Sequence, residues 1–66
     1  DTSVLNNLAS LYLQKKEYEK ALDWVNMALE INSENSYSYR IRGYIYKSLG
    51  KEKESKEDFA RVKYEK

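Results

Sequence analysis

Carboxylate, lysine and tyrosine side chains are the groups with which this chain would have to transfer protons or attack a substrate, because its 66 residues include no histidine and no cysteine. A general acid or base needs a pKa close to the working pH, which requires burial or a close charged neighbour. Helical periodicity places most of the acidic residues on exposed faces, where their pKa values have no reason to shift. The same two absences remove the common ligands of structural zinc. We therefore expect neither catalysis nor a metal site, and no cofactor.

Tyrosines alternate with basic residues in the second half of the chain, at Tyr37, Tyr39, Tyr44 and Tyr46. Aromatic rings among cations can stack on the bases of single-stranded RNA, so nucleic-acid binding is one alternative function. Residues 36–66 carry nine basic and five acidic side chains, a net charge of +4, whereas residues 1–35 carry three and six, a net charge of −3. The whole chain has a pI of about 8.1, which is below the strongly basic range of such binders. Nucleic acid is therefore not the favoured partner.

Helices are expected to position these groups, because the composition contains few helix breakers. Proline is absent, glycine occurs only at Gly43 and Gly50, and good helix formers are plentiful. Four helices are predicted from three signals. Apolar residues are spaced three and four apart, residues 32–35 form a polar turn, and Gly50 can take the left-handed conformation that ends a helix. The predicted helices cover residues 2 or 3 to about 15, 18 to 31, 36 to 49, and about 52 to the end.

The sequence also repeats itself after 34 residues, with small residues falling on small ones and large residues on large ones. The matched pairs are Leu5 and Tyr39, Ala9 and Gly43, Tyr12 and Tyr46, Ala21 and Ser55, Val25 and Phe59, and Ala28 and Val62. Small side chains allow two helix backbones to approach within about 8 to 10 Å, and the large ones fill the space between them. These residue types at this period resemble the tetratricopeptide repeat. The departures are Ser33 for the family's proline, Arg42 for its leucine and Ser55 for its alanine.

The resemblance covers the whole chain and implies an all-α fold, a right-handed α-solenoid of two antiparallel helix-turn-helix hairpins with four helices. We expect residues 1–66 to form a single domain, with repeat one at 2–35 and repeat two at 36–66. The expected repeat-packing residues are Leu8, Ala9, Tyr12, Ala21, Val25, Ala28, Tyr39, Gly43, Tyr46, Ser55, Phe59 and Val62.

The outer face of the fourth helix is expected to be solvated, as at the C-terminal end of an array of repeats. Charged residues there match apolar ones in the second helix. The pairs are Lys56 for Leu22, Lys63 for Leu29 and Glu65 for Ile31. Long charged side chains can also cover apolar surface with their stems, so a further neighbour stays open as an alternative.

In this family the first helix of each pair lines a concave groove that binds a peptide or a helix of a partner protein. By resemblance, the candidate groove residues are Asn6, Asn7, Ser10, Gln14, Tyr37, Arg40, Ile41, Tyr44 and Lys47. Amides can bond an extended backbone, tyrosines supply contact area, and Arg40 and Lys47 can donate to carboxylates. We therefore expect a non-catalytic protein–protein interaction module whose partner is a protein or peptide, with an acidic one favoured.

One subclass of the family grips the terminal carboxylate of heat-shock chaperones with lysines and asparagines at fixed groove positions. Three of those positions hold Asn6, Ser10 and Ile41 here, so a chaperone C-terminal carboxylate clamp is not expected. Self-association is a further alternative, since two repeats are fewer than the three usually needed to bury a continuous core. The opposite charges of the two halves could then favour stacking or a homodimer, with the apolar residues of the first hairpin as the contact. These are Leu22, Trp24, Val25, Leu29 and Ile31.

No stretch approaches the roughly 18 to 20 apolar residues that a membrane-spanning helix requires, so no membrane partner is expected. The absence of cysteine favours a reducing compartment such as the cytoplasm without identifying it.

Overall fold

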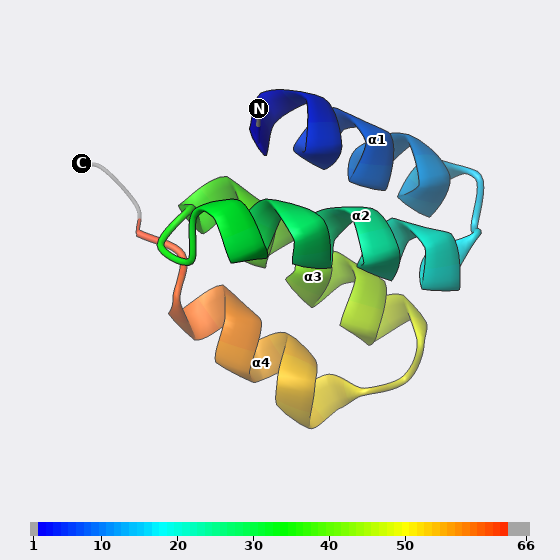
Figure 1. Ribbon diagram of the computed structural model, residues 1–66. Coiled ribbons are helices and arrows are strands. Elements are labelled where there is room, and N and C mark those ends of the chain that lie inside the picture. Colours follow the sequence, from blue (N-terminus) through cyan, green and yellow to red (C-terminus); the bar gives the residue numbers. More distant parts are fainter. Residues whose placement is uncertain (1, 64–66) are drawn as a thin grey trace.

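The computed structural model describes residues 2–63, which form two antiparallel helical hairpins stacked side by side (Figure 1). The helices are α1 (Thr2–Gln14), α2 (Tyr18–Ile31), α3 (Ser36–Ser48) and α4 (Glu52–Ala60). No strand occurs among these residues. The all-α fold with four helices in two hairpins, predicted from the sequence, is confirmed.

The two hairpin turns have the same backbone geometry. Lys16 and Gly50, which are 34 residues apart, both have positive φ angles, of 63° and 80°. After α1 the Lys16 N–H donates to the Leu13 carbonyl at 3.0 Å, and the Glu17 N–H donates to the Tyr12 carbonyl at 2.9 Å. The same pair of bonds follows α3, from Gly50 to the Lys47 carbonyl at 3.1 Å and from Lys51 to that of Tyr46 at 2.8 Å. This pattern closes a helix with a left-handed residue, and only the second turn uses glycine for it.

The turn between the hairpins is held by side chains of the polar run at 32–35. The Asn32 Oδ1 accepts from the Glu34 N–H, and the Asn35 Oδ1 caps α3 by accepting from the Ser38 N–H, both at 3.1 Å. The Tyr39 hydroxyl donates to the Ser33 carbonyl at 2.7 Å. These bonds satisfy backbone groups that the ends of α2 and α3 leave free, and so define the path between repeats.

The fourth helix is shorter than the sequence predicts, because α4 ends at Ala60 instead of filling the remainder of the chain. The Arg61 and Val62 N–H groups bond three residues back, to Asp58 and Phe59. The Lys63 N–H then donates to Ser36 Oγ at 3.1 Å and so does not continue the helical bonding. Residues 64–66, including Glu65, lie outside the described part of the chain.

The core lies where α3 covers the first hairpin. Its buried members are Ala9, Ala21, Val25, Ile41 and Ile45. Tyr12, Leu13, Tyr18, Leu22, Trp24 and Leu49 pack around them. In the described part of the chain, α4 contacts α3 but makes no backbone approach to α1 or α2. Apart from the turn at 32–35, the helix-to-helix backbone contacts between the two hairpins that are described all involve α3.

The expected repeat-packing residues line the contacts between helices to different depths. Ala9, Ala21, Val25, Ala28, Tyr39, Gly43 and Ser55 are buried, whereas Leu8, Tyr12, Tyr46, Phe59 and Val62 are half-buried. A Cβ on Gly43 would lie 2.9 Å from two carbons of the Phe59 ring, so glycine is what allows that ring to lie against α3. Ser55 stands where the family has alanine, and its buried hydroxyl donates a hydrogen bond to the Gly43 carbonyl at 2.8 Å.

Candidate partner-binding surface

Seven of the nine predicted groove residues lie on the accessible side of α1 and α3. Four of them follow one stripe of α3, with Tyr37 and Tyr44 each 47% exposed and Arg40 and Lys47 also exposed. On α1, Asn7 and Gln14 are exposed and Ser10 is half-buried. The stripe brings two aromatic rings and two cations onto one helix face.

The other two predicted groove residues are buried, which corrects their assignment to the surface. Asn6 is 1% exposed and Ile41 is 4% exposed. Ile41 belongs to the apolar core, while the Asn6 Oδ1 accepts a 2.8 Å hydrogen bond from Ser38 Oγ between α1 and α3. Both side chains face the neighbouring helix, because α3 crosses directly over that side of α1. Neither is available to a partner.

Arg42, which the sequence marks only as a departure from leucine, is the centre of a polar network. Its Nε donates to Oδ2 of Asp58 on α4 and its Nη2 donates to Oδ1 of the same carboxylate, both at 2.9 Å. Its Nη1 donates to Asn26 Oδ1, also at 2.9 Å. The hydrogen bond to Asp58 raises the pKa of the guanidinium above its ordinary value, although partial burial opposes this. Arg42 also lies over the rings of Tyr39 and Tyr46. These contacts make it a structural cation linking α2, α3 and α4.

Arg40 and Lys47 differ from Arg42 because neither side chain has a hydrogen bond or ion pair among the described residues. They are two and five residues from Arg42 along the same helix, yet they project from its exposed side. A cation that is not already paired within the protein can bind an external anion without first breaking a bond. Arg40 and Lys47 can therefore bind carboxylates of a partner, whereas the Arg42 guanidinium is already occupied by the carboxylate of Asp58.

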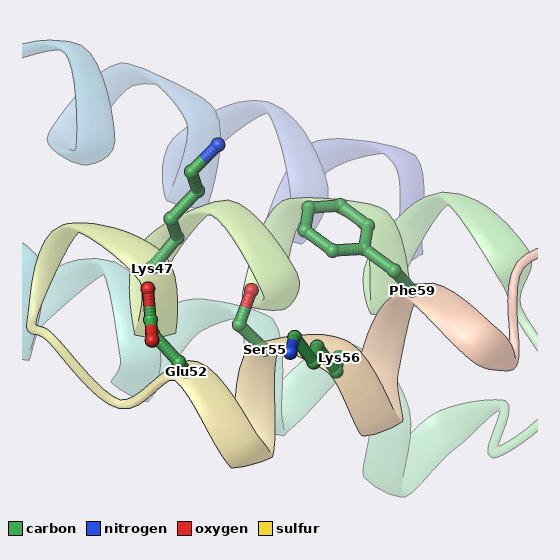
Figure 2. Close-up of a pocket in the computed structure, with 5 residues that line it drawn as sticks. All are labelled: Lys47, Glu52, Ser55, Lys56 and Phe59. Atoms are coloured by element: carbon green, nitrogen blue, oxygen red, sulfur yellow. The ribbon is translucent and has the colours of Figure 1, made fainter.

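Figure 2 shows an open hollow between α3 and α4, next to this surface. It has a volume of about 170 Å³ and is lined by Lys47, Glu52, Ser55, Lys56 and Phe59. The Phe59 ring lies against α3 and meets Tyr44 edge to face, with ring centroids 5.0 Å apart. Of the predicted groove residues, Lys47 reaches both the exposed stripe of α3 and the rim of this hollow.

Most of the apolar residues of the first hairpin that were predicted to mediate self-association pack inside the chain. Val25 and Leu29 are buried, and Leu22 and Trp24 pack against the core. Ile31 alone of these five is exposed. Four of these five side chains therefore pack at least partly within the chain, and a homodimer through this set of residues stays a prediction.

Two stacked hairpins with small residues at the helix crossings define a helical-repeat protein of the kind that presents a surface to other proteins. Residues 3–35 match the model of the tetratricopeptide repeat, and residues 37–65 match a second model of the same repeat. The chain belongs to the tetratricopeptide-repeat family. Comparisons with curated proteins and with solved structures gave no match.

Tetratricopeptide repeats are generally protein–protein interaction modules and typically act as scaffolds without catalytic activity. Among residues 2–63 no helix is long and apolar enough to cross a membrane. The part of the chain that is described also contains no group of three acidic side chains close enough to hold a metal ion.

Proposed function

We propose that this protein binds an acidic segment of a partner protein on the surface formed by α1 and α3. The surface comprises Tyr37, Arg40, Tyr44 and Lys47 from α3 and Asn7, Ser10 and Gln14 from α1. The partner is a peptide or a helix with several carboxylates, and the protein acts as an adaptor without catalysing a reaction.

The observation that carries this proposal is the distribution of acidic residues. Neither α1 nor α3 contains any aspartate or glutamate, whereas α3 contains Arg40, Arg42 and Lys47. The acidic residues of the described helices all belong to α2 and α4. The layer formed by α1 and α3 is therefore positive or neutral throughout, although the whole chain has a net charge of only +1. Such a field attracts acidic partners and disfavours basic ones.

The tyrosines supply the apolar part of the contact. Tyr37 and Tyr44 are separated by seven residues, or about two helical turns, and so they lie on the same side of α3. A tyrosine adds a large contact area and one hydroxyl while losing few rotamers, which is why it is frequent at energetically important positions of interfaces. Phe59 holds the Tyr44 ring in an edge-to-face contact, and this reduces the entropy lost on binding.

A matched set of fluorescein-labelled probes tests the proposal by fluorescence anisotropy. The first is a short peptide of alternating glutamate, aspartate, leucine and phenylalanine, the second has the acids replaced by glutamine and asparagine, and the third is an oligouridylate of equal length. We expect the protein to bind the acidic peptide more tightly than the other two, and the affinity to fall as salt concentration rises. Tighter binding of the oligouridylate would identify a nucleic-acid surface and reject the proposal.

The double variant Arg40→Ala/Lys47→Ala tests the two cations. Hydrogen bonds to charged groups contribute about 1.5 to 3 kcal/mol each, so even one lost bond should weaken the acidic peptide at least about tenfold. The matched control is Lys53→Ala/Lys63→Ala, which removes the same charge from exposed positions outside the surface. Circular dichroism would verify that both variants keep their helices. Equal affinities for the two variants would show that the cations of α3 do not bind the partner.

A further inference from the structure

The hollow between α3 and α4 is the counterpart of the site that α3 itself occupies on the first hairpin. Its lining residues are Lys47, Glu52, Ser55, Lys56 and Phe59. The residues 34 places earlier are Leu13, Tyr18, Ala21, Leu22 and Val25. All five of these earlier residues belong to the core beneath α3 or pack against it. The second hairpin therefore presents the same site as the first, but in the described structure no helix covers it (Figure 2).

The helix α3 fills its site on the first hairpin with one row of side chains. Ser38, Ile41 and Ile45 are buried, and Leu49 packs beside them. The residues 34 places earlier are Val4, Asn7, Leu11 and Lys15, all on one side of α1 and its C-terminal end. All four are exposed, and Val4 and Leu11 remain 56% and 50% exposed although they are apolar. The free side of α1 thus has an apolar pair at the positions that α3 uses to dock.

We propose that the protein associates with further copies of itself head to tail, with α1 of one copy lying in the hollow between α3 and α4 of the next. Val4 and Leu11 of the incoming copy take the places that Ser38 and Ile45 have within the chain. They cover Phe59 and Ser55 on the floor of the hollow. No rearrangement of either copy is needed, because the same docking geometry already exists between the two hairpins.

Charge supports a second copy as the occupant. Residues 1–35 have a net charge of −3 and residues 36–66 of +4, so head-to-tail contact joins halves of opposite net charge, whereas contact between two like ends does not. Among the described residues the acidic ones of the first half lie on α2 and in the turns, not on α1, so this attraction acts at long range. One specific pair also matches. Within the chain Leu49 and Tyr18 line the same hollow, and the residues that replace them in the proposed contact are Lys15 and Glu52, a cation and an anion.

The contact is reversible, because its site is more polar than the one inside the chain. Leu13, Tyr18 and Leu22 are replaced by Lys47, Glu52 and Lys56, so less apolar area is buried. The lysine stems can still pack along the incoming helix with their ammonium groups in water. Each bound copy leaves one hollow and one α1 face free, and a heterologous contact of this kind produces chains that lengthen with concentration instead of closed dimers.

Sedimentation velocity across micromolar to millimolar concentrations of the 66-residue chain tests the proposal. We expect a sedimentation coefficient that rises continuously with concentration and falls back when salt is added. The variant Leu11→Glu would place a carboxylate in the apolar floor and should weaken association at least about tenfold. Met27→Glu is the matched control, since Met27 is 45% exposed on α2 and lies outside the proposed contact.

The proposed pair of Lys15 and Glu52 allows a test by charge exchange. Glu52→Lys alone and Lys15→Glu alone should each weaken association, while the chain with both changes should regain it. Circular dichroism of each variant would verify its fold. A parent chain that stays monomeric at millimolar concentration, one that stops at a dimer, or equal behaviour of Leu11→Glu and Met27→Glu would overturn the proposal.

Discussion

The guanidinium of Arg42 and the carboxylate of Asp58 form a two-point ion pair between α3 and α4, with both donor–acceptor distances at 2.9 Å. Asp58 is almost fully buried, its side chain 5% exposed, and Arg42 is its only described cation. The residues 34 places earlier are Leu8 and Trp24. Where the first repeat has two apolar residues, the second repeat has a charged pair, so the departure at Arg42 is compensated by a second change on the facing helix.

Replacing Arg42 alone should therefore be costly. Arg42→Leu leaves the Asp58 carboxylate buried without its cation, and we expect the free energy of unfolding to fall by about 3 to 5 kcal/mol in urea denaturation. The double variant Arg42→Leu/Asp58→Trp recreates the residues of the first repeat and should recover most of this loss. Arg40→Leu, an exposed change on the same helix, is the control and should have an effect within about 0.5 kcal/mol. Equal losses for Arg42→Leu and Arg40→Leu would contradict this account of the pair.

Gly43 is smaller and Phe59 is larger than the residue 34 places earlier in the first repeat. Those earlier residues are Ala9 and Val25. Because a Cβ on Gly43 would meet the Phe59 ring at 2.9 Å, Gly43→Ala should cost about 1 to 3 kcal/mol by overpacking. In a Phe59→Val background the same change should instead stabilise by up to about 1 kcal/mol, since alanine is the better helix former. Chemical denaturation of the four proteins measures this coupling. If Gly43→Ala had the same effect in both backgrounds, the proposed contact would be wrong.

Lys16 adopts a left-handed conformation that favours glycine. Its φ angle of 63° corresponds to the φ angle of 80° at Gly50, where glycine is present. Lys16→Gly removes the steric cost of a side chain in this conformation, offset in part by the greater freedom of glycine when unfolded. We expect the free energy of unfolding to rise by up to about 1 kcal/mol. The reciprocal change Gly50→Lys should lower it, and thermal melts that move in the same direction for both variants would argue against this explanation.

Ser33, which stands where the family has proline, should accept that residue. It is the second residue of a turn closed by a 3.3 Å bond from the Asn35 N–H to the Asn32 carbonyl, a position that favours proline. Asn32 is extended, with φ −140° and ψ 96°, as a residue before proline should be. Ser33→Pro should raise the free energy of unfolding by about 0.4 to 1 kcal/mol by restricting the unfolded chain. Ser33→Ala is the control with no expected gain, and a destabilised proline variant would refute the prediction.

Helix positions and repeat period could be predicted from the sequence because both depend on interactions close together along the chain. The start of α2 at Tyr18, the turn at 32–35 and the left-handed Gly50 follow from local spacing and turn-forming residues. The length of α4 could not be predicted in this way. After Ala60 the chain leaves the helix and makes a contact far along the sequence, since the Lys63 N–H donates to the hydroxyl of Ser36, 27 residues away.

The amino-acid sequence by itself determined the four helices, the 34-residue repeat and hence the family, because helix propensity and apolar spacing are properties of each segment. Tertiary structure alone decided which polar side chains remain free. Asn6 and Asn7 are neighbours with the same side chain, yet α3 covers Asn6 and leaves Asn7 exposed. Arg40 and Arg42 differ likewise, since Asp58 on another helix binds only the second. The reason is that the burial and pairing of a side chain depend on which neighbouring helix crosses its face, and that crossing is set by packing between residues far apart in the chain.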